Sequence, residues 1–268
     1  MTSEGLSRQE CAVTVLGGPT AVIDMGGLRL VSDPTFDEPG PHGYLTKTAG
    51  PAVVESGLGP VDVVLVSHDQ HPDNLDARGR TFAEAAPLVV SGPLGAARLG
   101  ERAVGLPPWT SHSLPRPDGG GDLTVLAVPA VHGPEDGQRD ADGNVNCEVT
   151  GFILSGRGLP TVYLSGDNAS IRTVAEVSRR VPGIDAALLH AGAARVPAKF
   201  DGRPLSMDSR RTAAAAAVLD AKVVVPAHYD GWTHFSEGLE DLEVAFREAG
   251  LSSVLRVAPH GSWVTLRP

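Results

Sequence analysis

Short apolar and β-branched runs, separated by glycine-rich turns, fill the first third of the chain. This pattern is typical of strands joined as hairpins. Residues 36–60 are rich in Gly and Pro and predict a loop. The elements expected in this part are strands at Cys11–Leu16, Thr20–Asp24, Leu28–Ser32, Val61–Ser67 and Leu88–Ser91, then a helix near Leu94–Leu99.

The second half changes from strands alone to strands that alternate with helices. Strands are predicted at Leu123–Val128, Val149–Leu154 and Thr161–Ser165, with a polar excursion over residues 133–146. Helical spacing of apolar residues then predicts a helix over Ser170–Val181, with Asn168 or Ser170 as its N-cap. The remaining predictions are a strand at Ile184–Leu189, a helix from a cap at Asp208 through Leu219, a strand at Lys222–Pro226, a helix at Leu239–Ala249, and strands at Val254–Val257 and Ser262–Leu266. No fixed-period repeat or long linker divides the chain, so we expect one α/β domain over residues 1–268.

Composition narrows the classes of function. The 268 residues are 41% hydrophobic and 20% charged, with a net charge of −10. An acidic chain is a poor binder of nucleic acid or anionic membrane, so neither is expected as a partner. Cys11 and Cys147 are too few for a disulfide framework, and no apolar run is long enough for a signal core or membrane span, so a cytoplasmic location is expected. The sequence does not indicate an oligomeric state.

Chemically capable side chains recur where predicted strands end. Loops beyond strand carboxyl ends line the ligand crevice in α/β architectures, so we expect these side chains to converge. They are His68, His71 and Asp73 after Val61–Ser67, His132 after Leu123–Val128, Asp167 after Thr161–Ser165, His190 at the end of Ile184–Leu189, and His228 after Lys222–Pro226. A single histidine in such a place is more often a loop or core residue, but the joint pattern favours a site for zinc, iron or manganese. His42, His112 and His260 lack this context and are expected at the surface or in a turn.

The segments around these residues resemble the motifs of the metallo-β-lactamase superfamily. They are 67-SHDQHPDN-74, 130-AVHG-133, 165-SGDN-168 and 226-PAHY-229. Three further segments, 190-HAGAA-194, 206-SMDSRR-211 and 222-KVVVPAHYDGW-232, resemble its ascorbate-6-phosphate lactonase-like branch. The resemblance implies a four-layer αββα sandwich. It also implies that the first-motif histidines and the lone histidine hold one metal, that the motif aspartate, its final histidine and the late histidine hold a second, and that the Ser-Gly-Asp carboxylate bridges both.

The first motif departs from the family pattern by one inserted residue. Counted from His68, the second family histidine falls on Gln70, whereas counted back from Asp73 it falls on His71. We favour His71, because imidazole is a better ligand than an amide. Asn74 replaces the last motif histidine, which predicts one firm metal site and one weak site.

The expected metal is Zn²⁺, with Mn²⁺ or Fe²⁺ as alternatives. The expected core of the site is His68, His71, His132 and Asp167, completed or flanked by Asp73 and His228. His190 and His234 are expected to orient ligands or to pack, more than to bind metal.

By this resemblance the chain is expected to be a hydrolase in which a metal-bound hydroxide attacks a small ester, lactone or phosphoester. Asp73 or Asp167 would orient the hydroxide or take its proton, and Tyr229 would either stabilise a developing oxyanion or simply pack.

Arg195 and Lys199 could pair with a substrate anion or lie at the surface. Trp109, Trp232 and Phe235 could line a pocket or belong to the core. Two alternatives stay open: a metal-poor binding or regulatory protein that has lost efficient hydrolysis, and an iron redox protein.

Overall fold

Alternating apolar residues build the core between the two sheets of the protein. The computed structural model describes residues 5–267. In one strand after another, odd and even positions face opposite sides, as a pleated strand requires. Val63 and Leu65 point into the core between two sheets, whereas Val64 and Val66 point to the outer face of their own sheet. The runs that the sequence shows as continuous apolar stretches are therefore buried on both faces.

The first sheet has seven strands and is antiparallel at one side and parallel at the other. Strand β3 pairs in parallel with β6, β6 with β7, and β7 with β8, whereas the β15, β1, β2 and β3 pairs are antiparallel. The spatial order is β15 (Val264–Thr265), β1 (Cys11–Gly17), β2 (Thr20–Met25), β3 (Leu28–Ser32), β6 (Val63–Leu65), β7 (Val89–Ser91) and β8 (Ala103–Gly105).

The second sheet has six strands and the same mixed character. Pairs β9–β10, β10–β11 and β11–β12 are antiparallel, and β12–β13 and β13–β14 are parallel. The spatial order is β14 (Val223–Ala227), β13 (Ala186–His190), β12 (Val162–Leu164), β11 (Thr150–Gly156), β10 (Asp122–Pro129) and β9 (Ser111–Pro115).

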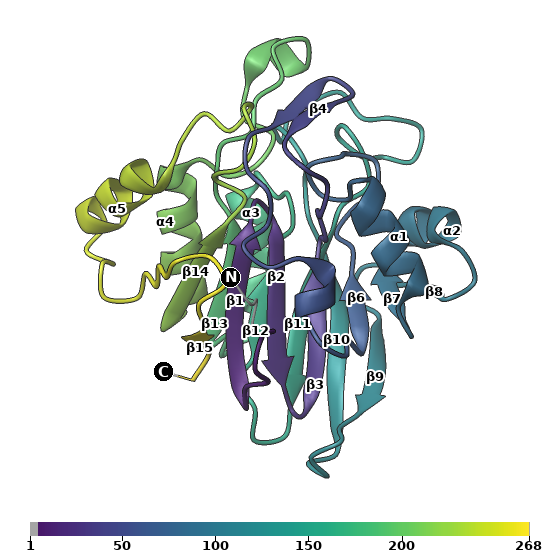
Figure 1. Cartoon of the computed structure of the whole chain (residues 1–268). Helices are drawn as coiled ribbons and strands as arrows, with labels where there is room; N and C mark the ends of the chain where they lie inside the picture. Colours follow the sequence, from purple (N-terminus) through teal and green to yellow (C-terminus); the bar gives the residue numbers. More distant parts are fainter. Residues whose placement is uncertain (1–4, 268) are drawn as a thin grey trace.

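Helices cover the outer faces of the two sheets, which confirms the predicted αββα sandwich (Figure 1). Residues 5–267 form five α-helices: α1 (Ala77–Ala85), α2 (Pro93–Leu99), α3 (Ile171–Arg180), α4 (Ser209–Leu219) and α5 (Leu239–Glu248). Helices α1 and α2 lie on the seven-stranded sheet, and α3, α4 and α5 pack on the six-stranded sheet. The side chains of Ser170 and Asp208 cap α3 and α4, as the sequence predicts. Two short 3₁₀ turns, Glu55–Gly57 and Phe200–Gly202, complete the helical elements.

Several elements differ from the sequence prediction. The predicted strand at Val254–Val257 is wrong: Val254 ends a turn that starts at Leu251, so Leu255 alone forms a bridge, to Val224. The predicted strand Ser262–Leu266 is reduced to β15. The predicted loop at residues 36–60 contains a hairpin of β4 (Gly40–His42) and β5 (Leu45–Lys47), and α1, β8 and β9 were not expected.

The strand directions bring the carboxyl ends of several strands to one edge. Strands β10 and β12 are both antiparallel to β11, so they run the same way, and β13 and β14 are parallel to β12. The loops after β10, β12, β13 and β14 therefore leave the six-stranded sheet at the same edge. The β4–β5 hairpin lies at the top of the molecule in Figure 1.

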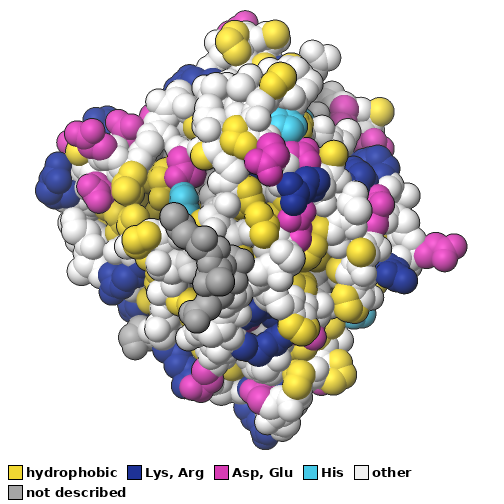
Figure 2. All heavy atoms as spheres, viewed as in Figure 1, with side chains coloured by type: hydrophobic (Ala, Val, Ile, Leu, Met, Phe, Trp, Pro, Cys, Tyr) yellow, Lys and Arg dark blue, Asp and Glu magenta, His cyan; other side chains and the backbone are white. Residues whose placement is uncertain are grey.

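The surface charge is mixed. Figure 2 shows acidic and basic side chains interspersed over the face that it presents, which is not the basic field that a nucleic acid needs. Within residues 5–267, no helix combines the length and hydropathy that a bilayer crossing requires. The absence of nucleic-acid and membrane partners stays a prediction.

Candidate metal centre

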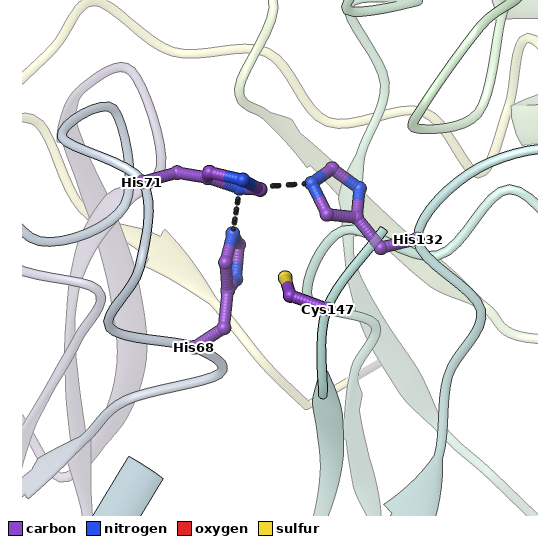
Figure 3. A group of neighbouring side chains, drawn as sticks. All are labelled: His68, His71, His132 and Cys147. Carbon is purple, nitrogen blue, oxygen red and sulfur yellow. Dashed lines mark hydrogen bonds between the residues drawn. The ribbon is translucent and has the colours of Figure 1, made fainter. Parts of the chain in front are cut away.

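Three histidines from two different loops meet in a buried cluster, which we call the three-histidine cluster: His68, His71 and His132. His71 Nδ1 lies 2.9 Å from His68 Nε2 and 3.0 Å from His132 Nε2 (Figure 3). Two nitrogens bound to one tetrahedral zinc at about 2.0–2.1 Å are roughly 3.3 Å apart. Both of these separations are therefore already close to the one that a shared metal imposes.

The protonation of the three-histidine cluster suits a cation. His132 Nδ1 donates to the carbonyl oxygen of Leu205 at 2.8 Å, so in the neutral ring Nε2 presents a lone pair to the cluster. Burial lowers the pKa of all three imidazoles, and the charge of neighbouring rings lowers those of His68 and His71 further, to about 3 for His71. Neutral imidazoles are the form that binds a metal.

A thiol joins the same group. Cys147 lies in the loop before β11, and its Sγ and one nitrogen of each of the three rings all lie within 4.8 Å of one another. Sequence reasoning missed this residue, because a lone cysteine in a polar loop has no neighbouring ligand to single it out.

A second donor cluster lies beside the first, and we call it the aspartate cluster: Asp73, Asp167, His190, His228 and His234. Asp167 Oδ1 accepts from His190 Nδ1 at 2.9 Å and lies 3.3 Å from His228 Nε2. Asp73 Oδ2 lies 3.1 Å from His228 Nε2 and 2.9 Å from His234 Nε2. The structure therefore places His190 and His234, which the sequence left as orienting or packing residues, in direct contact with the expected carboxylates.

Asp167 connects the two clusters. Its Oδ1 faces His190 and His228, whereas its Oδ2 lies 3.7 Å from His132 Nε2. Oδ2 is buried and has no hydrogen-bond partner among residues 5–267, and the same holds for His228 Nδ1. An unpartnered buried carboxylate oxygen is costly, so a cation between the clusters would stabilise it.

Electrostatics keep both carboxylates ionised. Burial alone would raise the pKa of Asp73, but hydrogen bonds from His228 and His234, and their charge, outweigh it and hold the pKa well below its ordinary value. At Asp167, burial again acts to raise the pKa, but the charge of His228 and the hydrogen bond from His190 outweigh it and lower the pKa. In return, these carboxylates raise the pKa of His228 against its burial.

Strained backbone surrounds the site. His228 has φ 59° and Asp33 has φ 40°, in the left-handed region that residues other than glycine rarely adopt. Gly192, after β13, is required here because a Cβ would lie 2.2 Å from the His228 carbonyl oxygen. Asp33 accepts from the Ser67 backbone N–H at 2.7 Å, and burial raises its pKa to about 7. These contacts fix the ends of β3, β6, β13 and β14 relative to one another.

The structure places the two candidates of the first motif differently. His71 is buried within the three-histidine cluster, whereas Gln70 is exposed. Asn74 is fully buried, and neither atom of its side-chain amide has a hydrogen-bond partner in the described part of the chain. His190 and His234 are the further imidazoles close to Asp167 and Asp73.

Tyr229 does not meet the other predicted site residues. It packs beside His260 in a separate small pocket with Val15 and Arg256, and burial raises its pKa to about 12. Tyr44, between β4 and β5, instead lines a pocket with His71, Asp73 and His132.

A groove of about 360 Å³ leads to the site. Tyr44, Leu45, Val196 and His234 line both this groove and an inner pocket that also includes His71, Asp73, His132 and Lys199. Arg195 and Phe235 line the groove. Lys199 Nζ lies 3.4 Å from His71 Nε2 and donates to Asn146 Oδ1 at 2.8 Å.

The other aromatic candidates lie apart from the groove. Trp232 is buried beneath Lys47, whose Nζ lies 5.6 Å from its ring, and Trp109 stacks with Arg180 on α3. Of the three aromatic residues singled out in the sequence, Phe235 is therefore the one that borders the site.

Comparisons with known proteins agree with this architecture. The chain is 25% identical over 240 residues to a UPF0173 metal-dependent hydrolase of Anaeromyxobacter dehalogenans, covering 88% of this chain and 77% of that protein. It is 29% identical over 190 residues to a UPF0173 metal-dependent hydrolase of Methanosphaerula palustris, covering 70% and 75%. Among solved structures, an isothiocyanate hydrolase from Delia radicum gut bacteria superimposes with a TM-score of 0.79 at 19% identity, covering 96% of this chain and all of that one.

A possible metal-dependent hydrolase from Veillonella parvula superimposes with a TM-score of 0.80 at 16% identity, over 96% of this chain and all of that one. At such identities these structures show the shared fold alone. The family model of the beta-lactamase superfamily domain matches residues 29–229, which is three quarters of the chain. This span includes every residue of both donor clusters except His234. The chain therefore belongs to the metallo-β-lactamase superfamily.

Proposed function

We propose that this protein is a metal-dependent hydrolase that acts on a small ester, lactone or phosphoester. The observation that carries the proposal is Asp167, whose carboxylate lies between two buried donor clusters and has one unpartnered oxygen among the described residues. Relatives named metal-dependent hydrolases support the same conclusion. Imidazole and carboxylate donors favour Zn²⁺, with Mn²⁺ or Fe²⁺ as alternatives.

The residues have separable tasks in this proposal. A bound divalent metal lowers the pKa of water and polarises the bond under attack. Asp73 and Asp167 are poor proton acceptors at neutral pH, because their pKa values lie far below it. Instead, they orient the imidazoles that contact them, which are His190, His228 and His234. His234, bonded through Nε2 to Asp73 and lining the groove, is the imidazole placed beside the substrate.

The groove sets the substrate class in this proposal. Its walls combine the apolar side chains Leu45, Val196 and Phe235 with the cation Arg195, and Lys199 lies further in. A small substrate with an apolar part and a carboxylate or phosphate would fit both features. The segments that resemble those of ascorbate-6-phosphate lactonase-like hydrolases support a lactone or phosphoester within that class.

Metal analysis combined with an activity screen tests the proposal. Protein purified without added metal should contain metal, and added Zn²⁺ or Mn²⁺ should raise the hydrolysis of esters, lactones or phosphodiesters. His132→Ala should abolish that hydrolysis, whereas the control His112→Ala, on β9 outside both clusters, should leave it unchanged. Hydrolysis that survives His132→Ala would exclude the proposed site.

A second candidate function is a metal-poor binding or regulatory protein. Buried Asn74, in place of a motif histidine, is the observation that favours it. Metal below about half an equivalent per chain, without rescue by Zn²⁺ or Mn²⁺, would favour this alternative over hydrolysis.

A further inference from the structure

The two cysteines of the chain have different surroundings. Cys11, at the start of β1, packs in the apolar core between the sheets. Cys147 is just as buried, at 6% exposure against 5%, but belongs to none of the three apolar clusters formed by residues 5–267. A buried free cysteine ordinarily behaves as a small apolar side chain. That role fits Cys11 and does not fit Cys147.

The thiol of Cys147 faces metal-binding atoms. Its Sγ lies within 4.8 Å of a nitrogen on each ring of the three-histidine cluster. Figure 3 shows the sulfur pointing toward the space that the three rings border. In a tetrahedral zinc site with Zn–S about 2.3 Å and Zn–N about 2.0–2.1 Å, donor atoms lie roughly 3.3–3.6 Å apart. The four donor atoms, all within 4.8 Å of one another, are therefore within about 1.5 Å of these separations.

The loop holds Cys147 in this position from both sides. On one side, Asn146 has φ 66°, and its Oδ1 accepts from Lys199 Nζ at 2.8 Å. On the other, Glu148 Oε2 accepts from two backbone N–H groups at the start of α2, at 2.8 and 3.0 Å. Thr150 N–H then donates to the carbonyl oxygen of Ser67, next to His68, at 2.9 Å. These bonds hold the cysteine loop on both sides, and the Thr150–Ser67 bond joins it directly to the segment that carries His68.

We propose that Cys147 is the fourth protein ligand of the metal in the three-histidine cluster. A sulfur–metal bond forms, the S–H bond breaks, and the proton passes to the solvent. Asp167 Oδ2, 3.7 Å from His132 Nε2, faces the same cluster and would be a further donor to this metal. This proposal rests on metal binding at the cluster and does not require hydrolysis.

Cobalt substitution tests the proposal, because thiolate ligation of Co²⁺ gives a charge-transfer absorption in the near ultraviolet. Metal-free protein is titrated with Co²⁺ and its spectrum recorded without substrate. The band should be present in the unaltered protein, absent in Cys147→Ser and Cys147→Ala, and retained in the matched control Cys11→Ser. Circular dichroism checks that each variant is folded. Zn²⁺ binding by the Cys147 variants should weaken by at least about 100-fold, because loss of an outer-shell partner alone costs about 10–100-fold.

Two results would overturn the ligand assignment. One is stoichiometric Co²⁺ in the unaltered protein without the band, and the other is a band that persists in both Cys147 variants. Cobalt that fails to bind the unaltered protein at all would overturn this assignment together with the metal premise of the proposed function. Intact hydrolysis with bound Co²⁺ and no band would overturn the role of Cys147 and leave the hydrolase proposal standing.

Discussion

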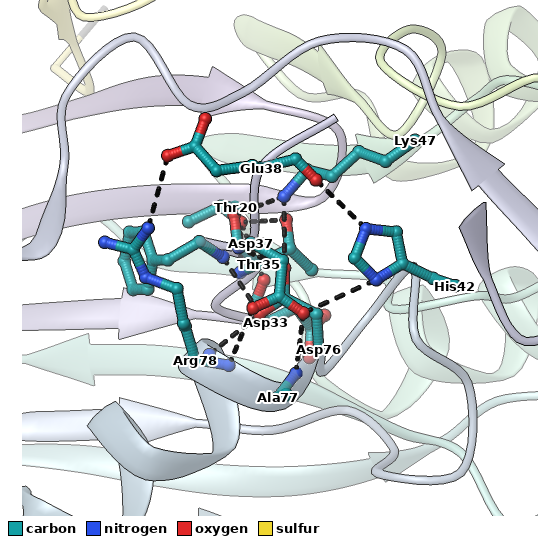
Figure 4. Close-up of polar contacts among 12 residues, drawn as sticks. Thr20, Asp33, Thr35, Asp37, Glu38, His42, Lys47, Asp76, Ala77 and Arg78 are labelled. Carbon is teal, nitrogen blue, oxygen red and sulfur yellow. Dashed lines mark hydrogen bonds and ion pairs between the residues drawn. The ribbon is translucent and has the colours of Figure 1, made fainter. Parts of the chain in front are cut away.

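A buried ion pair fixes the hairpin that borders the groove, and its removal gives the sharpest stability prediction. Lys47, at the end of β5, donates to Asp76 Oδ2 and to the Thr35 carbonyl oxygen, each at 3.0 Å (Figure 4). The side chains of Lys47 and Asp76 are 3% and 0% exposed. Asp76 also caps α1 by accepting from Gly79 N–H at 2.8 Å. The pair therefore joins the β4–β5 hairpin, which carries Tyr44, to α1.

Lys47→Met keeps most of the apolar stem and removes the charge. Removing one partner of a buried ion pair costs about 3–5 kcal/mol, because the other charge is left uncompensated. Asp76 keeps three backbone N–H donors after the change, including those of Phe36 at 2.9 Å and Asp37 at 2.7 Å. We therefore expect the lower end, a loss of about 3 kcal/mol in the free energy of unfolding.

Equilibrium urea unfolding, followed by circular dichroism and by fluorescence, measures this loss. The matched control is Lys222→Met, because Lys222 pairs with Asp220 at 2.7 Å while the two side chains are 53% and 87% exposed. An exposed pair contributes about 0–1 kcal/mol, so the control should be close to the unaltered protein. A loss below about 1 kcal/mol for Lys47→Met, or one equal to that of the control, would refute the reasoning from burial.

Three further predictions concern the site. His71→Ala should greatly weaken Zn²⁺ binding measured by competition with a chromophoric chelator, and Gln70→Ala should not; equal losses would contradict the assignment of His71. Gly192→Ala should lower the free energy of unfolding by about 1–3 kcal/mol and reduce bound metal, because its Cβ would meet the backbone of His228, whereas Gly50→Ala has space and serves as the control. Burial lowers the pKa values in the three-histidine cluster below the ordinary value of about 6.5, so below that pH the unfolded chain takes up protons that the folded chain does not. The raised pKa values of Asp33 and His228 act in the opposite direction, but they are outnumbered by the three lowered imidazole values. Metal-free protein should therefore lose stability as the pH falls from about 6.5 to 4, and a constant urea midpoint across this window would contradict that.

The elements that the sequence predicted well are those whose pattern is local. The run at Val61–Ser67 is apolar on both faces because it is a central strand, and period-2 and period-3.6 patterns placed the other main strands and α3 to α5. Helix α1 was missed because its buried positions, Gly79 and Ala83, are small residues that give no strong period-3.6 signal. The segment Val254–Val257 has strand-forming residues, but a turn at its start leaves one position for pairing.

The same limit applies to the site. Motif spacing identified His68, His71, His132, Asp167 and His228, which the structure brings together. It could not assign Cys147 to the site, or His190 and His234 to their carboxylate partners, because these contacts depend on which loops meet at the sheet edges. The spacing also suggested Tyr229, whose neighbour His228 does reach the aspartate cluster, but the backbone at φ 59° turns the chain between them. Side-chain direction after a strained residue does not follow from sequence spacing.

Crystals of the protein soaked with Zn²⁺, with anomalous difference density recorded at the zinc edge, test the central claim most directly. The account predicts one peak within the three-histidine cluster in contact with Cys147, a second peak at the aspartate cluster, and the Asp167 carboxylate between them. It also predicts that His71 points to the metal and Gln70 to the solvent. No peak beside Asp167, or density that joins Gln70 to a metal, would contradict the account.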